Sequence, residues 1–149
     1  MKKQRQTKTI SRAVLDSSTT KRWLQGLLLL AVALVFASLL GADFLYDDYS
    51  FIHKNTLIQQ FDGTMVSRVF QSYYMAHYVP VTLLSFAFDI AVAGYEAWWF
   101  HLVNILLHAG STLLLFSIFR RLAGNLWIGF GVAFLFAVHP LHVESVAWI

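Results

Sequence analysis

Two adjacent carboxylates are the side chains in this sequence best suited to acid–base chemistry. Asp47 and Asp48 stand in the segment LYDDYSFIHKN, a few residues after a long apolar run. One of two close carboxylates can act as a general base while the other orients it or binds a metal ion, because their like charges separate their pKa values. The pair could equally be an ordinary solvated feature at the end of a membrane helix. Spacing alone leaves both interpretations open.

A second polar cluster lies near the other end of the chain, in the segment HPLHVES. His139, His142 and Glu144 are residue types that bind metal ions. Pro140 favours a helix that starts at this point, which would leave His139 outside it. A turn at the membrane interface is the simpler interpretation, because three ligands so close in sequence converge only with a specific backbone bend.

A third polar set is spaced for one face of a helix. His101, Asn104 and His108 recur at i, i+3 and i+7, with Ser111 close to the same face. Polar groups inside a membrane face protein or a cavity, because lipid cannot satisfy them. Hydrogen bonding between helices is preferred to a proton relay as the role of this stripe.

Composition indicates what kind of chain must position these groups. Of the 149 residues, 58% are hydrophobic and 13% are charged, which is typical of an all-α membrane protein. The net charge of +3 does not indicate nucleic acid, because the basic residues cluster beside hydrophobic segments. The sequence has no cysteine, which excludes a disulfide framework and a thiolate metal site.

Charge and hydropathy predict where the chain starts relative to the membrane. Residues 1 to 22 form a basic tail, which the positive-inside rule places in the cytoplasm. The uncharged run from Leu24 to Ala42 would span about 28 Å as a helix, so a first transmembrane helix is expected over 24 to 43. A cleaved signal peptide is the alternative, although its apolar region would be shorter.

Further spans are expected in the second half of the chain, which gives about three transmembrane helices in all. The second covers residues 100 to 119 and ends in Arg120 and Arg121. The third covers 124 to 141. Its apolar centre is too short to cross the membrane alone, so the residues on either side must be part of the span. The two clusters, Asp47 with Asp48 and the HPLHVES segment, would then lie on the same outer face and could form one site.

The external loop, residues 44 to 99, is expected to carry interfacial amphipathic helices. One helix face is predicted from helical spacing after a cap at Asp62 or Thr64. Its apolar members are Val66, Val69, Phe70, Tyr73 and Tyr74. The apolar segment 81 to 95 is short for a span and carries Thr82, Ser85 and Asp89 as a polar stripe. It is expected either in the interface or packed in protein with that stripe turned inward.

Four motifs in order carry a resemblance to a known family: FLYDDYSFIHKN, HYVPVTLLSFAFDIAVAG, FHLVNILLHAGSTLLLFSIFRRL and FAVHPLHVESVAWI. They resemble the amino-terminal membrane region of integral-membrane proteins with tetratricopeptide repeats. Those proteins are similar to the C superfamily of glycosyltransferases, which includes protein O-mannosyltransferases. The resemblance covers roughly residues 44 to 149. It implies that residues 23 to 149 are the front of a longer polytopic membrane domain, and the bacterial inner membrane is the expected location.

The resemblance implies an activity and roles for the two acids. A sugar would pass from a polyprenyl-phosphate carrier to a hydroxyl of an acceptor protein or lipid, on the extracytoplasmic face. Asp47 matches the family's catalytic acidic residue in the first external loop and is expected to be the base. Asp48 would support it or bind a divalent metal ion.

Binding of the acceptor or of the carrier phosphate is expected from a wider set of residues: His77, Tyr78, His101, His139, His142 and Glu144. The family often has a polar or basic residue beside its Pro-Leu-Thr motif. This sequence has Val79 there and reads PVT, so a phosphate-binding arginine is not carried over. A transporter fragment using the His101, Asn104 and His108 stripe, and a non-catalytic membrane anchor, are the alternative functions.

Overall fold

The computed structural model describes residues 18–149, and this part of the chain is helical throughout, with no β-strand. The all-α prediction is therefore confirmed. The described residues divide into two compact units. Unit 1 contains the chain up to Ala37 together with Ile105–His142, and unit 2 contains Ser38–Asn104 together with Val143–Ile149.

Two helices are long and apolar enough to cross a membrane. The first is α2 (Ser18–Phe36) with the 3-10 turn η1 (Ala37–Gly41), and the second is α6 (Ala97–Leu122). They match two of the three predicted spans. α2 begins inside the stretch expected to be the basic tail, so Lys21 and Arg22 lie in its first turns. The rest of that predicted tail, residues 1 to 17, lies outside the described residues.

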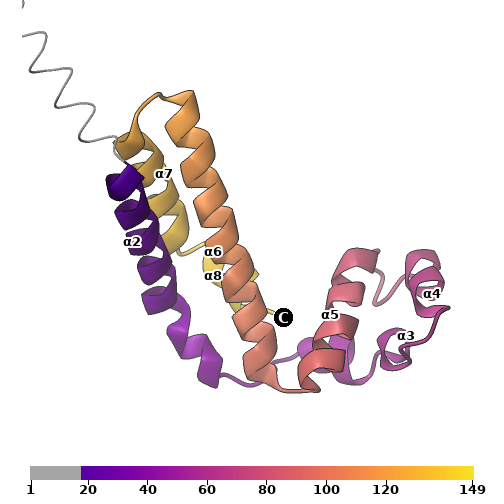
Figure 1. The fold of residues 1–149 in the computed structure, drawn as a ribbon. Helices are drawn as coiled ribbons and strands as arrows, with labels where there is room; N and C mark the ends of the chain where they lie inside the picture. Colours follow the sequence, from indigo (N-terminus) through magenta and orange to yellow (C-terminus); the bar gives the residue numbers. More distant parts are fainter. Residues whose placement is uncertain (1–17) are drawn as a thin grey trace, which may run out of the picture. The chain divides into compact units, whose positions relative to one another are not determined.

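In unit 1, the helix α7 (Leu126–Val138) packs against α2, beside it in Figure 1. Asn125 is the N-cap of α7, and its side chain accepts hydrogen bonds from the N–H groups of Trp127 and Ile128. The core of the unit is Leu24, Leu28, Phe116, Leu126 and Ala133. At 1.5 Å per residue the 13 residues of α7 extend about 20 Å, which is short of a hydrocarbon core. The third predicted span therefore stays a prediction.

Small residues allow α7 to approach its neighbour closely. Gly129, Ala133 and Ala137 follow one another at every fourth position, and all three are buried. A Cβ atom added to Gly129 would lie 2.7 Å from the backbone nitrogen of Arg120 in α6. The opposite side of α7, including Trp127 and Leu135, is exposed, as expected of a lipid-facing surface.

Unit 2 is built on three short helices that pack against one another: α3 (Thr56–Gln59), α4 (Met65–Gln71) and α5 (Pro80–Ala93) (Figure 1). Residues from the segments on either side complete its core. That core consists of Phe44, Ile52, Ile58, Met65, Val69, Leu83, Phe86, Ala87 and Phe100.

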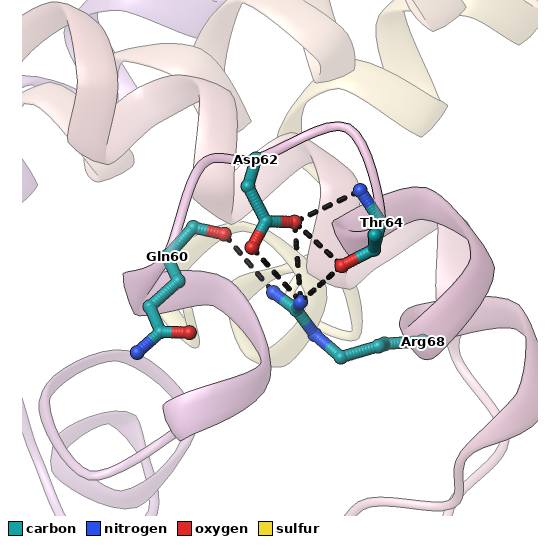
Figure 2. A network of polar contacts seen from close by, with 4 residues as sticks. All are labelled: Gln60, Asp62, Thr64 and Arg68. Atoms are coloured by element: carbon teal, nitrogen blue, oxygen red, sulfur yellow. Dashed lines mark hydrogen bonds and ion pairs between the residues drawn. The ribbon is translucent and has the colours of Figure 1, made fainter.

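An exposed polar network holds the connection between α3 and α4 (Figure 2). The Arg68 guanidinium donates to both carboxylate oxygens of Asp62, at 3.1 Å each, and to the Gln60 carbonyl at 3.1 Å. The Asp62 carboxylate also accepts from the Thr64 N–H at 2.9 Å and from its hydroxyl. Because these bonds favour the ionised form, the pKa of Asp62 is lowered to about 2. Asp62 therefore holds the backbone just before α4 through the Thr64 N–H, while Thr64, the residue at the N-cap position, makes no side-chain capping hydrogen bond.

The predicted amphipathic helix was wrong in its extent. α4 ends at Gln71, and the backbone N–H groups of Tyr74 and His77 then donate to each other's carbonyls at 3.0 and 2.8 Å. The two central residues of this tight turn, Met75 and Ala76, have φ of 48° and 64°, which side chains other than glycine seldom adopt. Val69 is buried as expected, but Val66, Phe70 and Tyr73 are exposed.

The polar stripe on α5 turns inward at one residue. Asp89 is buried, and its Oδ1 accepts a hydrogen bond from the Trp99 indole N–H at 3.0 Å. Thr82 and Ser85 are exposed. The alternative in which the helix packs into protein is therefore realised at Asp89, whose carboxyl has a hydrogen-bond partner inside unit 2.

Candidate functional site

The two adjacent acids of the sequence stand at the start of a π-helical turn, η2 (Tyr49–His53). The Lys54 N–H donates to the Tyr49 carbonyl at 3.1 Å, an i to i+5 hydrogen bond, while the Asp47 carbonyl accepts from Ser50 and Phe51 at 2.8 Å each. Single π turns are rare and are frequently found at functional sites. This local winding leaves the Asp47 side chain exposed and buries Asp48, of which 2% is exposed.

Asp48 is held by one oxygen only. Its Oδ2 accepts a hydrogen bond from the Leu45 N–H at 2.8 Å, and its Oδ1 has no hydrogen-bond partner among residues 18–149. Burial raises the pKa of this carboxyl, an effect that the backbone N–H groups of Leu45 and Ile149 and then the charge of His101 oppose. A carboxyl with a raised pKa is better matched to taking a proton near neutral pH than an exposed one.

His101 lies in the same unit as Asp48 and is buried to the same degree, with 2% exposed. Neither of its ring nitrogens has a hydrogen-bond partner in the part of the chain that the structure describes. The residue before it, Phe100, packs edge to face on Phe44 with ring centroids 5.6 Å apart. This contact joins the start of α6 to the segment that carries the two acids.

His77 and Tyr78 are exposed and follow the tight turn after α4. The Tyr78 hydroxyl donates to the Phe70 carbonyl at 3.2 Å, and the Tyr74 hydroxyl donates to the Ser50 carbonyl inside the π turn. The hydroxyl of Tyr74 therefore ties the segment before His77 to the segment after the two acids. Both residues predicted to bind the carrier stay open to a ligand.

The HPLHVES residues are divided between the two units. His139 ends α7 and is exposed, and its Nδ1 accepts from the Leu141 N–H at 3.2 Å. His142 begins α8 (His142–Ala147), with its ring 4.2 Å from that of Phe136 and 5.9 Å from that of His139. Glu144 is exposed in the first turn of α8 and is counted with unit 2. Their predicted convergence with Asp47 and Asp48 stays a prediction.

His108 has the hydrogen-bonding role that was preferred for the polar stripe. It is buried in unit 1, its Nε2 lies 3.2 Å from the Ala137 carbonyl of α7, and its ring stacks on Phe136 at 5.0 Å. Asn104 belongs to unit 2, where its amide donates to the Trp148 carbonyl at 2.9 Å. These contacts match bonding between helices better than a continuous proton path.

No group of three or more His, Asp or Glu residues within 18–149 is arranged so that it could hold a metal ion. The predicted metal role of Asp48 therefore gains no further ligands from this part of the chain.

Sequence reasoning missed two residues of this region. Asn55 is fully buried and caps α3, its Oδ1 accepting from the Leu57 N–H at 3.1 Å, while its Nδ2 has no partner among the described residues. Asn before a short helix is a recognisable N-cap signal, so this residue could have been found. The Phe44 contact with Phe100 had no such signal, because it joins residues far apart in the chain.

Together these features define a class: an all-helical membrane chain with two candidate spans and a buried carboxyl in the segment between them.

No family model matches the sequence, and no solved structure matches it. The chain is 36% identical to protein O-mannosyl-transferase TMTC2 of Homo sapiens over 126 residues, which are 77% of this chain and 15% of that protein. It is 32% identical to TMTC2 of Drosophila melanogaster, again over 77% of this chain and 13% of the relative.

A further relative is protein O-mannosyl-transferase TMTC4 of Homo sapiens, 32% identical over 91% of this chain and 22% of its own length. The homologues of this chain are protein O-mannosyl-transferases of the TMTC family, which confirms the resemblance carried by the four motifs. The chain spans less than a quarter of the length of these relatives. Because they are eukaryotic proteins, the expected bacterial inner membrane is not supported.

Proposed function

We propose that this chain is part of a membrane glycosyltransferase that moves a sugar from a polyprenyl-phosphate carrier to a hydroxyl of an acceptor protein on the extracytoplasmic face. Its homologues are named protein O-mannosyl-transferases, and two of its helices could span a membrane. The observation that carries the proposal is the buried Asp48 carboxyl, which has one oxygen free for a ligand in the segment between those helices.

The reaction needs a base at the acceptor oxygen. That oxygen forms a bond to the anomeric carbon, while the bond from this carbon to the carrier phosphate breaks and its electron pair leaves with the phosphate. The acceptor hydroxyl's proton passes to a carboxylate, and Asp48 takes this role because burial raises its pKa. Asp47 is exposed beside it and orients the acceptor, which exchanges the roles expected from the sequence.

The remaining predicted residues and elements complete the proposed site. The N-terminus is cytoplasmic, α2, α6 and α7 with its flanks cross the membrane, and residues 44 to 99 form the external loop. The exposed apolar residues of α4 and the turn after it suit the membrane interface. The proposed binding residues for acceptor or carrier phosphate are His77, Tyr78, His101, His139, His142 and Glu144.

The proposal is tested by measuring sugar transfer in native membranes that contain one of three matched variants. Asp48→Asn keeps the size of the side chain but removes the base, so sugar transfer from the polyprenyl-phosphate donor should fall by about 10² or more. Asp47→Asn should reduce transfer less. Asp43→Asn alters an exposed carboxyl before the site and should leave transfer unchanged. Normal transfer by Asp48→Asn, at normal abundance in the membrane, would remove Asp48 from the mechanism.

A further inference from the structure

Three aromatic side chains of unit 2, Tyr49, His53 and Tyr95, form a stack of nearly parallel rings. The His53 imidazole stacks on the Tyr49 ring with centroids 5.1 Å and planes 26° apart, and on the Tyr95 ring at 4.7 Å and 22°. Two rings that stack on one imidazole lie on its opposite faces. Tyr49 is 50% exposed and Tyr95 is 43% exposed, so this aromatic stack ends in an accessible tyrosine ring on each side.

The surrounding backbone and core hold the aromatic stack in place. Tyr49 and His53 begin and end the π turn η2, and the buried Phe44 packs edge to face on both rings, at 6.0 and 5.2 Å. Tyr95 comes from the other end of the loop. The residue before it, Gly94, ends α5 with a φ of 69°, which glycine adopts readily. The rings are therefore oriented by the fold before any ligand binds.

The Tyr49 end of the aromatic stack lies beside the two acids in the chain. Tyr49 directly follows Asp48, the proposed base, and is two residues from the exposed carboxylate of Asp47. A sugar ring has two kinds of surface. Its hydroxyls donate hydrogen bonds to carboxylates, and the partly positive hydrogens of its C–H groups are attracted to the electron-rich face of an aromatic ring. An exposed tyrosine beside an exposed carboxylate matches both surfaces.

We propose that the Tyr49 ring is the surface on which the pyranose ring of the donor sugar packs, and that His53 and Tyr95 are positioning residues that hold it. This inference rests on the proposed function, in which the anomeric carbon of that sugar bonds to the oxygen whose proton passes to Asp48. The sugar must therefore lie close to Asp48. A rigid aromatic ring provides contact area at a low cost in conformational entropy.

The test measures binding and needs no sugar transfer. Saturation-transfer difference NMR is recorded on the full chain in detergent, with methyl hexopyranosides as the probes and D-mannitol as the control. Mannitol carries the same kind of hydroxyls but has no ring face. Saturation of the protein's aromatic protons should reach the ring C–H protons of a pyranoside and should not reach mannitol. Equal signals from the two compounds would overturn the proposal.

Tyr49→Leu keeps an apolar side chain but removes the ring, so the pyranoside signal should fall about fivefold or more, while Tyr49→Phe should keep it. Tyr95→Leu removes only a supporting ring and should lower the signal by about twofold. Phe61→Leu is the matched control, because it removes another exposed aromatic ring of unit 2 and should leave the signal unchanged.

An unchanged signal in Tyr49→Leu would overturn the proposal. This is the result expected if Tyr49 only anchors the loop at the membrane interface, where tyrosine is common.

A measurement on the unaltered sequence covers the case in which Tyr49→Leu does not fold. A chain made with ring-deuterated tyrosine should lose the pyranoside signal, and one made with ring-deuterated tryptophan should keep it. A signal that survives deuteration of tyrosine would also overturn the proposal.

The outcomes separate this inference from the proposed function. If pyranosides bind at Tyr49 but Asp48→Asn transfers sugar normally, the proposed function fails while the sugar-binding ring stands. If Asp48→Asn abolishes transfer but Tyr49→Leu binds pyranosides normally, the inference alone fails.

Discussion

Asp47 and Asp48 are adjacent in the chain, but their surroundings differ because successive residues of a helical turn point in different directions. One side chain is exposed, while the other enters the core of unit 2 and binds the Leu45 N–H. The sequence identifies the pair, since two acids after an apolar run are easily seen. It does not show which acid is buried, because this depends on the winding of the π turn and on Phe44 and Phe100 packing together.

The carboxyl of Asp62 provides a prediction for a single residue. Its pKa of about 2 should rise toward the ordinary 3.8 in Arg68→Gln, because the guanidinium and its hydrogen bonds favour the ionised form. Since the folded pKa is the lower one, the stabilising effect is present above pH 3.8 and is lost as pH falls through about 2. The pKa of Asp62 in each variant is measured from the ¹³C chemical shift of its carboxyl as a function of pH.

Gln71→Ala serves as a control for this titration. Gln71 lies at the end of α4 and bonds to Ser67, outside the network around Asp62. Its removal should leave the Asp62 midpoint unchanged. If Arg68→Gln and Gln71→Ala gave the same midpoint, the ion pair of Figure 2 would have no effect on the charge of Asp62.

At the scale of elements, the close approach of α7 to α6 depends on one glycine. Gly129→Ala places a Cβ 2.7 Å from the Arg120 backbone nitrogen, and backbone cannot move aside as a flexible side chain can. We expect a loss of about 1–3 kcal/mol in stability. Thermal unfolding of the purified chain in detergent, followed by circular dichroism, measures the change.

Gly131→Ala is the matched control, because it makes the same substitution two residues further along the same helix. A Cβ at Gly131 meets no atom within 4 Å, so this variant should unfold no earlier than the unchanged chain. Equal losses in the two variants would mean that helix flexibility, and not the contact with Arg120, accounts for the effect.

The hydropathy of the sequence was sufficient to predict the helices that depend only on residues close together in the chain. The long apolar runs predicted α2 and α6, and the Asn125 cap and Pro140 bracket α7. The end of α4 could not be predicted in this way. Met75 and Ala76 are not turn residues by type, and the hydroxyl that holds their turn comes from Tyr74 bonding to distant Ser50. A helical pattern that runs on through the turn therefore predicts too long a helix.

At the scale of the whole molecule, the proposed site requires that both acidic clusters face the same side of the membrane. The chain has no cysteine, so single cysteines can be introduced at Ser50, Ser117 and Ser145 without background. A membrane-impermeant thiol reagent applied to intact membranes of known orientation should label positions 50 and 145 and leave 117 unlabelled. A fourth single cysteine, at the exposed Ser85, reports on which side of the membrane α5 lies.

Labelling of positions 50 and 145 on opposite faces would separate Asp47 and Asp48 from the HPLHVES segment. The proposed binding roles of His139, His142 and Glu144 would then be lost. The proposed role of Asp48 as the base would not be affected, since that role does not need the HPLHVES residues.

Because of the π turn at Tyr49–His53, the loss of one residue from this segment would change how the two acids are oriented relative to the rest of the loop. An i to i+5 bond such as that from Lys54 to Tyr49 accommodates one residue more than the i to i+4 bond of an α-helix. Deletion of a single residue here would let the turn rewind as an α-helix with little loss of backbone bonding. The preceding residues would turn by about 100° around the axis, which would carry Asp48 out of the core. Homologous loops one residue shorter at this place should thus retain their helices while losing the buried acid.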